Sequence, residues 1–403
     1  MKTIEVNSPG SEREFIEFPK RLYKGDPFWV CQLDSEVRAL FSPSGNNAFR
    51  HGEAVRWILV DENGKTIGRI AAFTDKIRSA AQSQPTGGMG FFEVIENREA
   101  AFALFDTARE WLKAKGMEAM DGPINFGENE SNWGLLIDGF THPGMGMPFH
   151  KKYYRQFFED YGFMNYFEQY SYHRDIGSVE VFPERFMKIA EWISKRPGYS
   201  FTHFRYSEKD KLIKDMVEIY NTTWASFKED FTPLETEMLE ETLNKARAFI
   251  DEELIWFAYH NEKPVAFFVI FPDLNMILRH FNGRLHLWNI LRFIYYKATH
   301  EMTRIRAFVA GVVPSHQNSG IESAIFYHLY KVFRKKRYYK ELELSWVGDF
   351  NPKMISIYEA IGAERAKTHI TYRYMINKSL PFRRYRDEKA DTKTGDGNAA
   401  TGN

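Results

Sequence analysis

The chain carries an internal duplication, and this feature restricts its fold more than any other. Two apolar runs joined by a polar turn occur in each half, and such runs predict a β-hairpin. Trp57 and Trp256 take the same place in the two hairpins, and Asp75 and Asp273 follow them, at a spacing of about 200 residues. The runs are residues 55–60 and 66–73 in the first half, and residues 254–259 and 264–271 in the second.

The ends of the two halves also correspond. An aromatic residue, a glycine and a strand tyrosine recur at a nearly constant offset, which favours duplication over chance. The paired positions are Phe158, Gly162 and Tyr172 in the first half and Tyr358, Gly362 and Tyr372 in the second. Each half is therefore predicted to consist of strands that alternate with helices.

Helices lie between the hairpins and these terminal units. Residues 98–113 and 320–336 place apolar side chains at helical spacing. The predicted fold class is α/β, with a mixed sheet and flanking helices in two tandem halves. We predict halves at residues 1–178 and 179–380, followed by a disordered tail at 381–403 that is rich in Gly, Asp, Lys and Thr.

Composition excludes several classes of protein. Lys plus Arg and Asp plus Glu both number 54, so no bulk charge attracts nucleic acid, and no nucleic-acid partner is expected. A single cysteine, Cys31, excludes an internal disulfide, and the 12 histidines show no metal-ligand spacing, so no metal is expected. The N-terminal segment has no apolar signal region, and a cytoplasmic location is predicted.

The segment at residues 306–336 carries the clearest chemical signal. An apolar strand at 307–313 runs into Pro314, a polar loop follows, and a helix opens at Gly320. Backbone N–H groups at a helix N-terminus have no internal partner, so this loop predicts a site for a pyrophosphate.

These residues resemble the pyrophosphate-binding signature of the GNAT (GCN5-related N-acetyltransferase) superfamily, V-x-P-x-x-[QR]-x-x-G-x-[GA]. Val312, Pro314, Gln317 and Gly320 match, whereas Glu322 stands where Gly or Ala is usual and would place a carboxylate close to the phosphates. A second signature, Asn-x6-Tyr-x3-Gly, follows as NPKMISIYEAIG. The resemblance implies cofactor contacts from Val312, Val313, Gln317, Asn318, Ser319, Gly320, Ile321, Asn351 and Tyr358.

The resemblance implies transfer of an acyl group from acetyl-CoA or a longer acyl-CoA to an amine on a small molecule or chain end. Tyr358 would protonate the departing thiolate. The first half has the same architecture but lacks the loop signature, and Phe158 replaces the tyrosine. Alternatives are a non-catalytic GNAT-like binding module, a FemX-like aminoacyl transferase of the kind that builds peptidoglycan, and an N-acyl amino acid synthase.

Acyl transfer to an amine also needs a base. Glu343, on the strand at 341–346, is the candidate, and a solvated carboxylate on the sheet face is the competing interpretation. The polar segment at 121–133 could line an acceptor pocket. Its candidate contact residues are Asn125, Glu128 and Asn132, against the simpler interpretation of a solvated loop.

A basic aromatic segment at residues 283–300 lengthens the second half. Leu287, Leu291, Ile294 and Ala298 form one helical stripe. Such a helix can lie on a membrane or cap an acyl chain. We favour packing of the stripe against the core, which makes peripheral membrane contact the lesser alternative.

Overall fold

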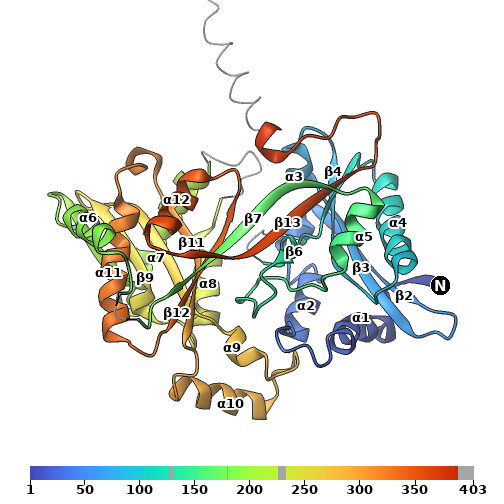
Figure 1. The fold of residues 1–403 in the computed structure, drawn as a ribbon, viewed down its shortest axis with the longest axis horizontal. Coiled ribbons are helices and arrows are strands. Elements are labelled where there is room, and N and C mark those ends of the chain that lie inside the picture. Colours follow the sequence, from blue (N-terminus) through green and yellow to red (C-terminus); the bar gives the residue numbers. More distant parts are fainter. Residues whose placement is uncertain (128–130, 179, 226–232, 389–403) are drawn as a thin grey trace, which may run out of the picture.

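The structure is a computed structural model that describes residues 1–127, 131–178, 180–225 and 233–388. Two α/β halves lie side by side and share one mixed, 13-stranded sheet (Figure 1). The predicted fold class is confirmed. None of the helices in the described ranges is long and apolar enough to cross a bilayer.

The first half alternates strands and helices in the predicted order. Its elements are β1 (Lys2–Glu5), α1 (Pro9–Leu22), α2 (Asp34–Leu40), β2 (Gly52–Val60), β3 (Thr66–Asp75), α3 (Lys76–Ala80), β4 (Thr86–Val94), α4 (Arg98–Ala114), β5 (Ala119–Gly122), β6 (Leu135–Asp138), α5 (Tyr154–Tyr161) and β7 (Met164–Asp175). The hairpin β2–β3 and the amphipathic helix α4 form where the apolar spacing predicts them.

The second half repeats the pattern with an inserted helical segment between its hairpin and β11. Its elements are α6 (Glu184–Ser194), β8 (Tyr199–His203), α7 (Lys209–Ala225), α8 (Thr236–Ala246), β9 (Ile255–His260), β10 (Lys263–Pro272), α9 (Asn275–Leu278), α10 (Leu287–Ala298), β11 (Arg304–Val312), α11 (Ile321–Lys335), β12 (Glu341–Gly348), α12 (Pro352–Ala360) and β13 (Glu364–Met375).

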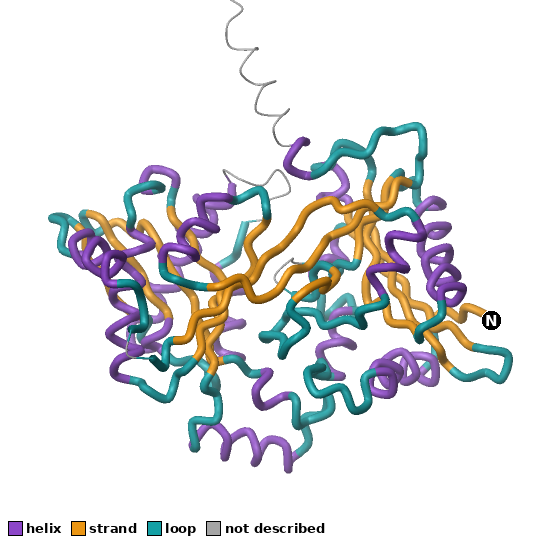
Figure 2. The backbone as a smooth tube through the Cα atoms, in the orientation of Figure 1, coloured by secondary structure: helices purple, strands orange, loops and turns teal. Residues whose placement is uncertain are grey.

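The two halves exchange their last strands. The sheet order is β1-β2-β3-β4-β5-β13-β7-β12-β11-β10-β9-β8, so β13 of the second half pairs with β5 of the first, and β7 of the first half pairs with β12 of the second. β7 and β13 pair antiparallel with each other from Met164 to His173. Figure 2 shows these long strands crossing the middle of the molecule.

The repeated aromatic positions pack across this exchange. Phe158 on α5 contacts Tyr372 on β13, with ring centroids 5.4 Å apart. Tyr358 on α12 contacts Tyr172 on β7 at 5.3 Å. The last helix of each half therefore packs on the last strand of the other half, which relates the two halves by an approximate twofold arrangement.

Two expectations need correction. The predicted disordered tail begins too early, because Tyr385 packs against Tyr166, Phe167 and Phe350, and Tyr166 donates a hydrogen bond to Glu388 at 2.7 Å. Residues 389–403 lie outside the described residues. The apolar stripe of α10 does not pack against the core: Leu287, Leu291 and Ile294 are exposed.

Because the halves exchange strands, removing one buried ion pair can test whether the two halves unfold cooperatively. Arg373 on β13 is fully buried and bonds Asp121 on β5, with Nε to Oδ1 at 2.7 Å. Arg373→Met leaves the Asp121 carboxylate buried and unpaired, which costs about 3–5 kcal/mol. We expect calorimetry to show one transition at a lower temperature, because β13 belongs to both halves of the sheet.

The matched control is Arg98→Met, which removes the exposed pair between Arg98 and Asp160. Its cost should stay below about 1 kcal/mol. Two separate transitions in the Arg373 variant, with one unshifted, would contradict cooperative unfolding of the halves.

Candidate functional site

The predicted site lies where two parallel strands of the second half part. β11 and β12 pair only from Arg304 to Arg306 with Glu341 to Glu343. Beyond that point β12 follows β7, with a register break between Leu344 and Val347. The Ser345 hydroxyl lies beyond the last pair and donates to the carbonyl of Phe308 on β11 at 3.0 Å. Backbone groups at this separation are thus free of the regular ladder between β11 and β12.

The predicted pyrophosphate loop connects β11 to α11. Val312 ends β11, and Gln317 Nε2 donates to its carbonyl at 3.3 Å. Val313 donates its N–H to Val265 on β10. Gly320 caps α11 in the left-handed region at φ 79°, and no side chain caps this helix.

The turn presents a set of unpartnered backbone donors. Five backbone N–H groups donate no hydrogen bond to any described residue. They belong to Asn318, Gly320, Ile321, Glu322 and Ser323. The Ser319 hydroxyl is buried there and has no hydrogen-bond partner in the described part of the chain. Orphan donors at the positive end of a helix dipole suit a phosphate group. The loop residues therefore fit the pyrophosphate of a coenzyme A ester.

Packing against α6 fixes the shape of this turn. A Cβ atom on Gly320 would lie 2.5 Å from Ile193 Cδ1, so a larger residue would displace the helix start. Arg196, just beyond α6, donates to the Ser319 carbonyl at 3.3 Å. The left-handed φ and the close approach both require glycine at this position.

Glu322, the departure from the family signature, is buried and paired. Its carboxylate lies 3.5 Å from Lys353 Nζ at the start of α12. The ammonium offsets the negative charge beside the unpartnered N–H groups. The local charge is therefore compatible with an anion, in spite of the carboxylate.

Tyr358 lies on α12, and Asn351 immediately precedes this helix. The Tyr358 side chain is buried, and its hydroxyl donates to the Ser345 carbonyl at 3.4 Å. Burial raises the pKa of Tyr358 above its ordinary value, so the phenol is protonated at neutral pH. Asn351 accepts the N–H of Met354 at 3.2 Å and caps the helix.

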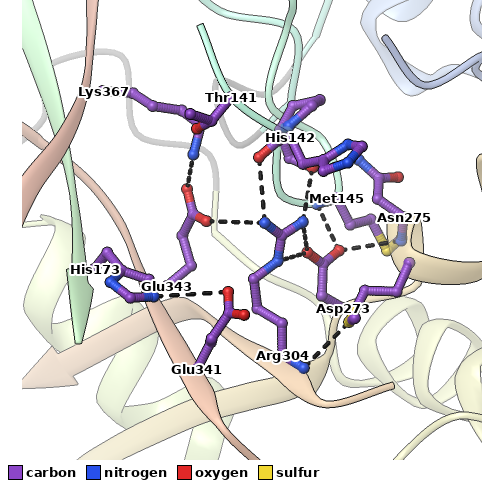
Figure 3. Close-up of polar contacts among 12 residues, drawn as sticks. Thr141, His142, Met145, His173, Asp273, Asn275, Arg304, Glu341, Glu343 and Lys367 are labelled. Carbon is purple, nitrogen blue, oxygen red and sulfur yellow. Dashed lines mark hydrogen bonds and ion pairs between the residues drawn. The ribbon is translucent and has the colours of Figure 1, made fainter. Parts of the chain in front are cut away.

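Glu343 is not a solvated carboxylate. It is 1% exposed, accepts a hydrogen bond from Lys367 Nζ at 2.7 Å, and lies 3.6 Å from Arg304 Nη1 (Figure 3). Both of its oxygens therefore face a cation. The competing interpretation of a solvated strand face is wrong, because loop residues of the first half cover this face. The role of Glu343 as a base stays a prediction.

That covering loop links the halves through the same network. Arg304 pairs with Asp273 at 2.6 Å and donates to the carbonyls of His142 and Pro143. Asp273 in turn accepts the N–H of Met145 at 3.0 Å (Figure 3). The polar face of β11 and β12 is therefore closed by the first half of the chain.

Sequence reasoning missed Arg306. It is 2% exposed, and its Nε and Nη1 atoms have no hydrogen-bond partner in the described ranges. Burial lowers the pKa of its guanidinium below the ordinary value. The signal was present in the alternation of arginines with apolar residues in RIRAF, since a strand within a sheet that is covered on both faces buries both sets of side chains.

Two of the three predicted acceptor residues, Asn125 and Asn132, lie in the described ranges. Asn132 accepts a hydrogen bond from Gln32 at 2.7 Å and lines a cavity of the first half with Arg69 and His150. Asn125 is buried, and its Oδ1 atom has no partner among the described residues. Glu128 lies outside the described residues. The acceptor role of the three stays a prediction.

Comparison with known proteins identifies the second half. Residues 215–363 match the family model described as "Acetyltransferase (GNAT) family". These residues include the loop, Glu343 and Tyr358. Residues 215–363 are a GNAT family domain.

Two relatives match nearly the whole chain. One, named "Bacterial ceramide synthase", from Caulobacter vibrioides, is 27% identical over 382 residues, which cover 92% of this chain and 97% of the relative. The other, "Protein YghO" of Escherichia coli, is 26% identical over 377 residues, which cover 90% and 93%. Both alignments extend well beyond the GNAT domain into the first half.

Solved structures share the fold of both halves. A structure described as a "Tandem GNAT protein from the clavulanic acid biosynthesis pathway (without AcCoA)" superposes with a TM-score of 0.54 at 10% identity, covering 95% of this chain and 99% of that one. A fungal glucosamine N-acetyltransferase region gives 0.57 at 10% identity, covering 93% of this chain and 38% of that one. At such identity the likeness is one of fold, and it confirms the tandem GNAT architecture.

The pair of Glu322 and Lys353 yields a prediction on ligand binding. Lys353→Met leaves a buried carboxylate unpaired beside the unpartnered N–H groups, and we expect acetyl-CoA to bind about tenfold more weakly. Combining Lys353→Met with Glu322→Gln should restore the affinity, because the double variant carries no net charge there. Isothermal titration calorimetry measures both.

The single variant Glu322→Gln serves as the control, and it should bind at least as tightly as the parent protein. If Glu322→Gln alone weakens binding as much as Lys353→Met, the pair acts by some means other than charge compensation.

Proposed function

We propose that this protein transfers an acyl group from acyl-CoA to the primary amine of a long-chain amino alcohol. The observation that carries the proposal is the set of unpartnered N–H groups at the start of α11. This turn follows β11, the strand that separates from β12 beyond Arg306, and the Tyr358 hydroxyl contacts β12 at the Ser345 carbonyl. A turn that suits a phosphate and a protonated phenol both lie where β11 and β12 separate, and together they suit an acyl-CoA thioester as donor.

The turn at residues 317–321 would hold the pyrophosphate. Its open backbone N–H groups, at Asn318, Gly320 and Ile321, together with the Ser319 hydroxyl, can each donate a hydrogen bond to a phosphate oxygen. Asn351 uses its side-chain oxygen to cap α12, which leaves its amide group for a contact with the pantetheine arm. Val312 would offer a backbone contact where β11 ends, whereas the N–H of Val313 already donates to Val265 and its carbonyl accepts the N–H of His316.

Tyr358 would act on the leaving group. In the reaction the amine nitrogen bonds to the thioester carbonyl carbon, the carbon–sulfur bond breaks, and the sulfur gains negative charge. Because burial raises the pKa of Tyr358, its hydroxyl keeps the proton until a strong acceptor develops next to it. The sulfur would take the place that the Ser345 carbonyl now holds as acceptor.

Glu343 would receive the proton that the attacking amine loses. Lys367 and Arg304 hold its carboxylate in place, so the transfer would run through water or follow displacement of Lys367. Glu343 is buried on the polar face of β12, and the first half of the chain covers this face of the sheet. An acceptor bound between the halves would reach it.

The class of acceptor rests on the relative named as a ceramide synthase, which matches 92% of this chain at 27% identity. A ceramide is a long-chain amino alcohol acylated on its nitrogen. The match spans both halves, so it includes the segment that covers the polar face. A long-chain amine therefore fits better than an amine on a large folded protein.

Removal of one hydroxyl tests the mechanism. Tyr358→Phe keeps the packing against Tyr172 and places at this position the residue type that the first half carries at Phe158. We expect turnover to fall ~10²–10⁴-fold while the acetyl-CoA dissociation constant stays unchanged, because only the proton donor is lost.

Tyr172→Phe is the matched control, since it removes a hydroxyl from the neighbouring ring, and its turnover should equal that of the parent protein. Equal rates for Tyr358→Phe and the parent would assign Tyr358 to packing alone.

A second experiment tests the acceptor class. The purified protein is incubated with acyl-CoA esters of increasing chain length and with sphinganine, a short primary amine or a free amino acid in turn. Mass spectrometry should detect the amide of sphinganine above the others. Tight binding of acyl-CoA with amides formed only on the amino acid would keep the donor site and overturn the acceptor class.

A further inference from the structure

Helix α10 presents an apolar face to solvent that no part of the described chain covers. Trp288 is 72% exposed and Leu287 is 68% exposed, which are high values for residues of this size. The other large apolar side chains exposed on and next to this helix are Leu285, Ile290, Leu291, Ile294 and Tyr295. A contiguous patch of this kind marks an interaction surface.

Helical geometry separates this face from the one that anchors the helix. At about 100° per residue, the exposed apolar side chains within α10 span an arc of about 160°. Arg292 and Lys297 lie at the two edges of that arc. The opposite side carries Asn289, Phe293 and Tyr296, which are buried or half-buried.

The inner side fixes α10 firmly to the second half. Phe293 and Tyr296 pack against a small core that includes Ile277 and Phe281. Asn289 Nδ2 donates to the Arg284 carbonyl at 2.7 Å. In Figure 1 the helix lies along one edge of the molecule, beyond α9. The outward orientation of the apolar face is therefore built into the fold.

The charged side chains within the α10 segment are all basic. Residues 281–300 contain no Asp or Glu and include Arg284, Arg292 and Lys297, of which Arg284 is paired with two carboxylates of the first half. Arg292 is exposed and makes no ion pair in the described part of the chain. Trp288 and Tyr295 are the side chains that prefer the boundary between lipid headgroups and acyl chains. Apolar, aromatic and basic groups thus combine as in a helix that lies in a membrane interface.

A second copy of the chain is a poorer occupant. The 12 residues of α10 make a helix only about 18 Å long. A single face of that length falls well short of the ~800 Å² per partner that a stable interface buries. A bilayer needs no matching surface, and its anionic phosphates complement the basic edges of the arc.

We propose that α10 is an interfacial anchor that seats the protein on an anionic phospholipid bilayer. Its apolar face enters the headgroup and upper acyl region, and Arg292 and Lys297 reach lipid phosphates on either side. The helix lies in the plane of the membrane. This inference rests on α10 alone and is independent of the reaction proposed above.

Vesicle sedimentation tests the proposal without any substrate. The full chain should sediment with vesicles of mixed phosphatidylcholine and phosphatidylglycerol, more weakly with phosphatidylcholine alone, and less at high salt. The double variant Trp288→Ser with Leu291→Ser should lower the partition coefficient about tenfold or more, since two large side chains no longer enter the lipid. Arg292→Gln should weaken binding only to the anionic vesicles.

The matched control is the double variant Ile189→Ser with Trp192→Ser on α6, where both side chains are also exposed. It should bind vesicles like the parent protein, and circular dichroism should show all variants folded. Absence of vesicle binding, or an equal loss in the α6 variant, overturns the proposal. Self-association that the α10 variant abolishes, without vesicle binding, would assign the face to a second copy.

Discussion

The antiparallel pairing of β7 with β13 is the contact on which the rest of this structure depends. It runs from Met164 to His173 on one strand and joins two halves that would otherwise each end in an unpaired strand. Because β13 also pairs with β5 and β7 with β12, each half completes its sheet only with a strand from the other. An exposed sheet edge in the middle of the molecule is thereby avoided.

This exchange also makes the site of the GNAT domain a product of both halves. Tyr358 packs on Tyr172, a residue of the first half, and its hydroxyl reaches the register break of β12. The carbonyls of His142 and Pro143, again from the first half, hold Arg304 against Asp273. The first half therefore contributes structure to the site although it lacks the loop signature.

The buried charges between the halves are balanced by pairing rather than by solvent. Lys367 and Arg304 face Glu343, and Asp273 faces Arg304. A buried carboxylate is tolerated only with such partners. Arg306 stands apart, since two of its donors have no acceptor in the described ranges. It lies on β11, next to Glu343 on β12.

Local sequence determined a large part of this protein. The hairpins, the helices α4 and α11, the tandem α/β architecture and the loop that ends at Gly320 all follow from apolar spacing, turn residues and short signatures. These features depend on neighbours in the chain, so a pattern of residues is sufficient to predict them. The duplication could be recognised in the sequence for the same reason.

Tertiary structure alone decided which strand pairs with which, and therefore what surrounds each side chain. The spacing of Tyr172 and Tyr372 is the same whether each strand stays in its own half or crosses to the other, because strand partners are chosen by long-range packing. Glu343 is buried because a distant loop covers it, and the stripe of α10 is exposed because no segment in the described ranges folds back over it. Burial depends on elements far apart in the chain, which periodicity within one segment does not encode.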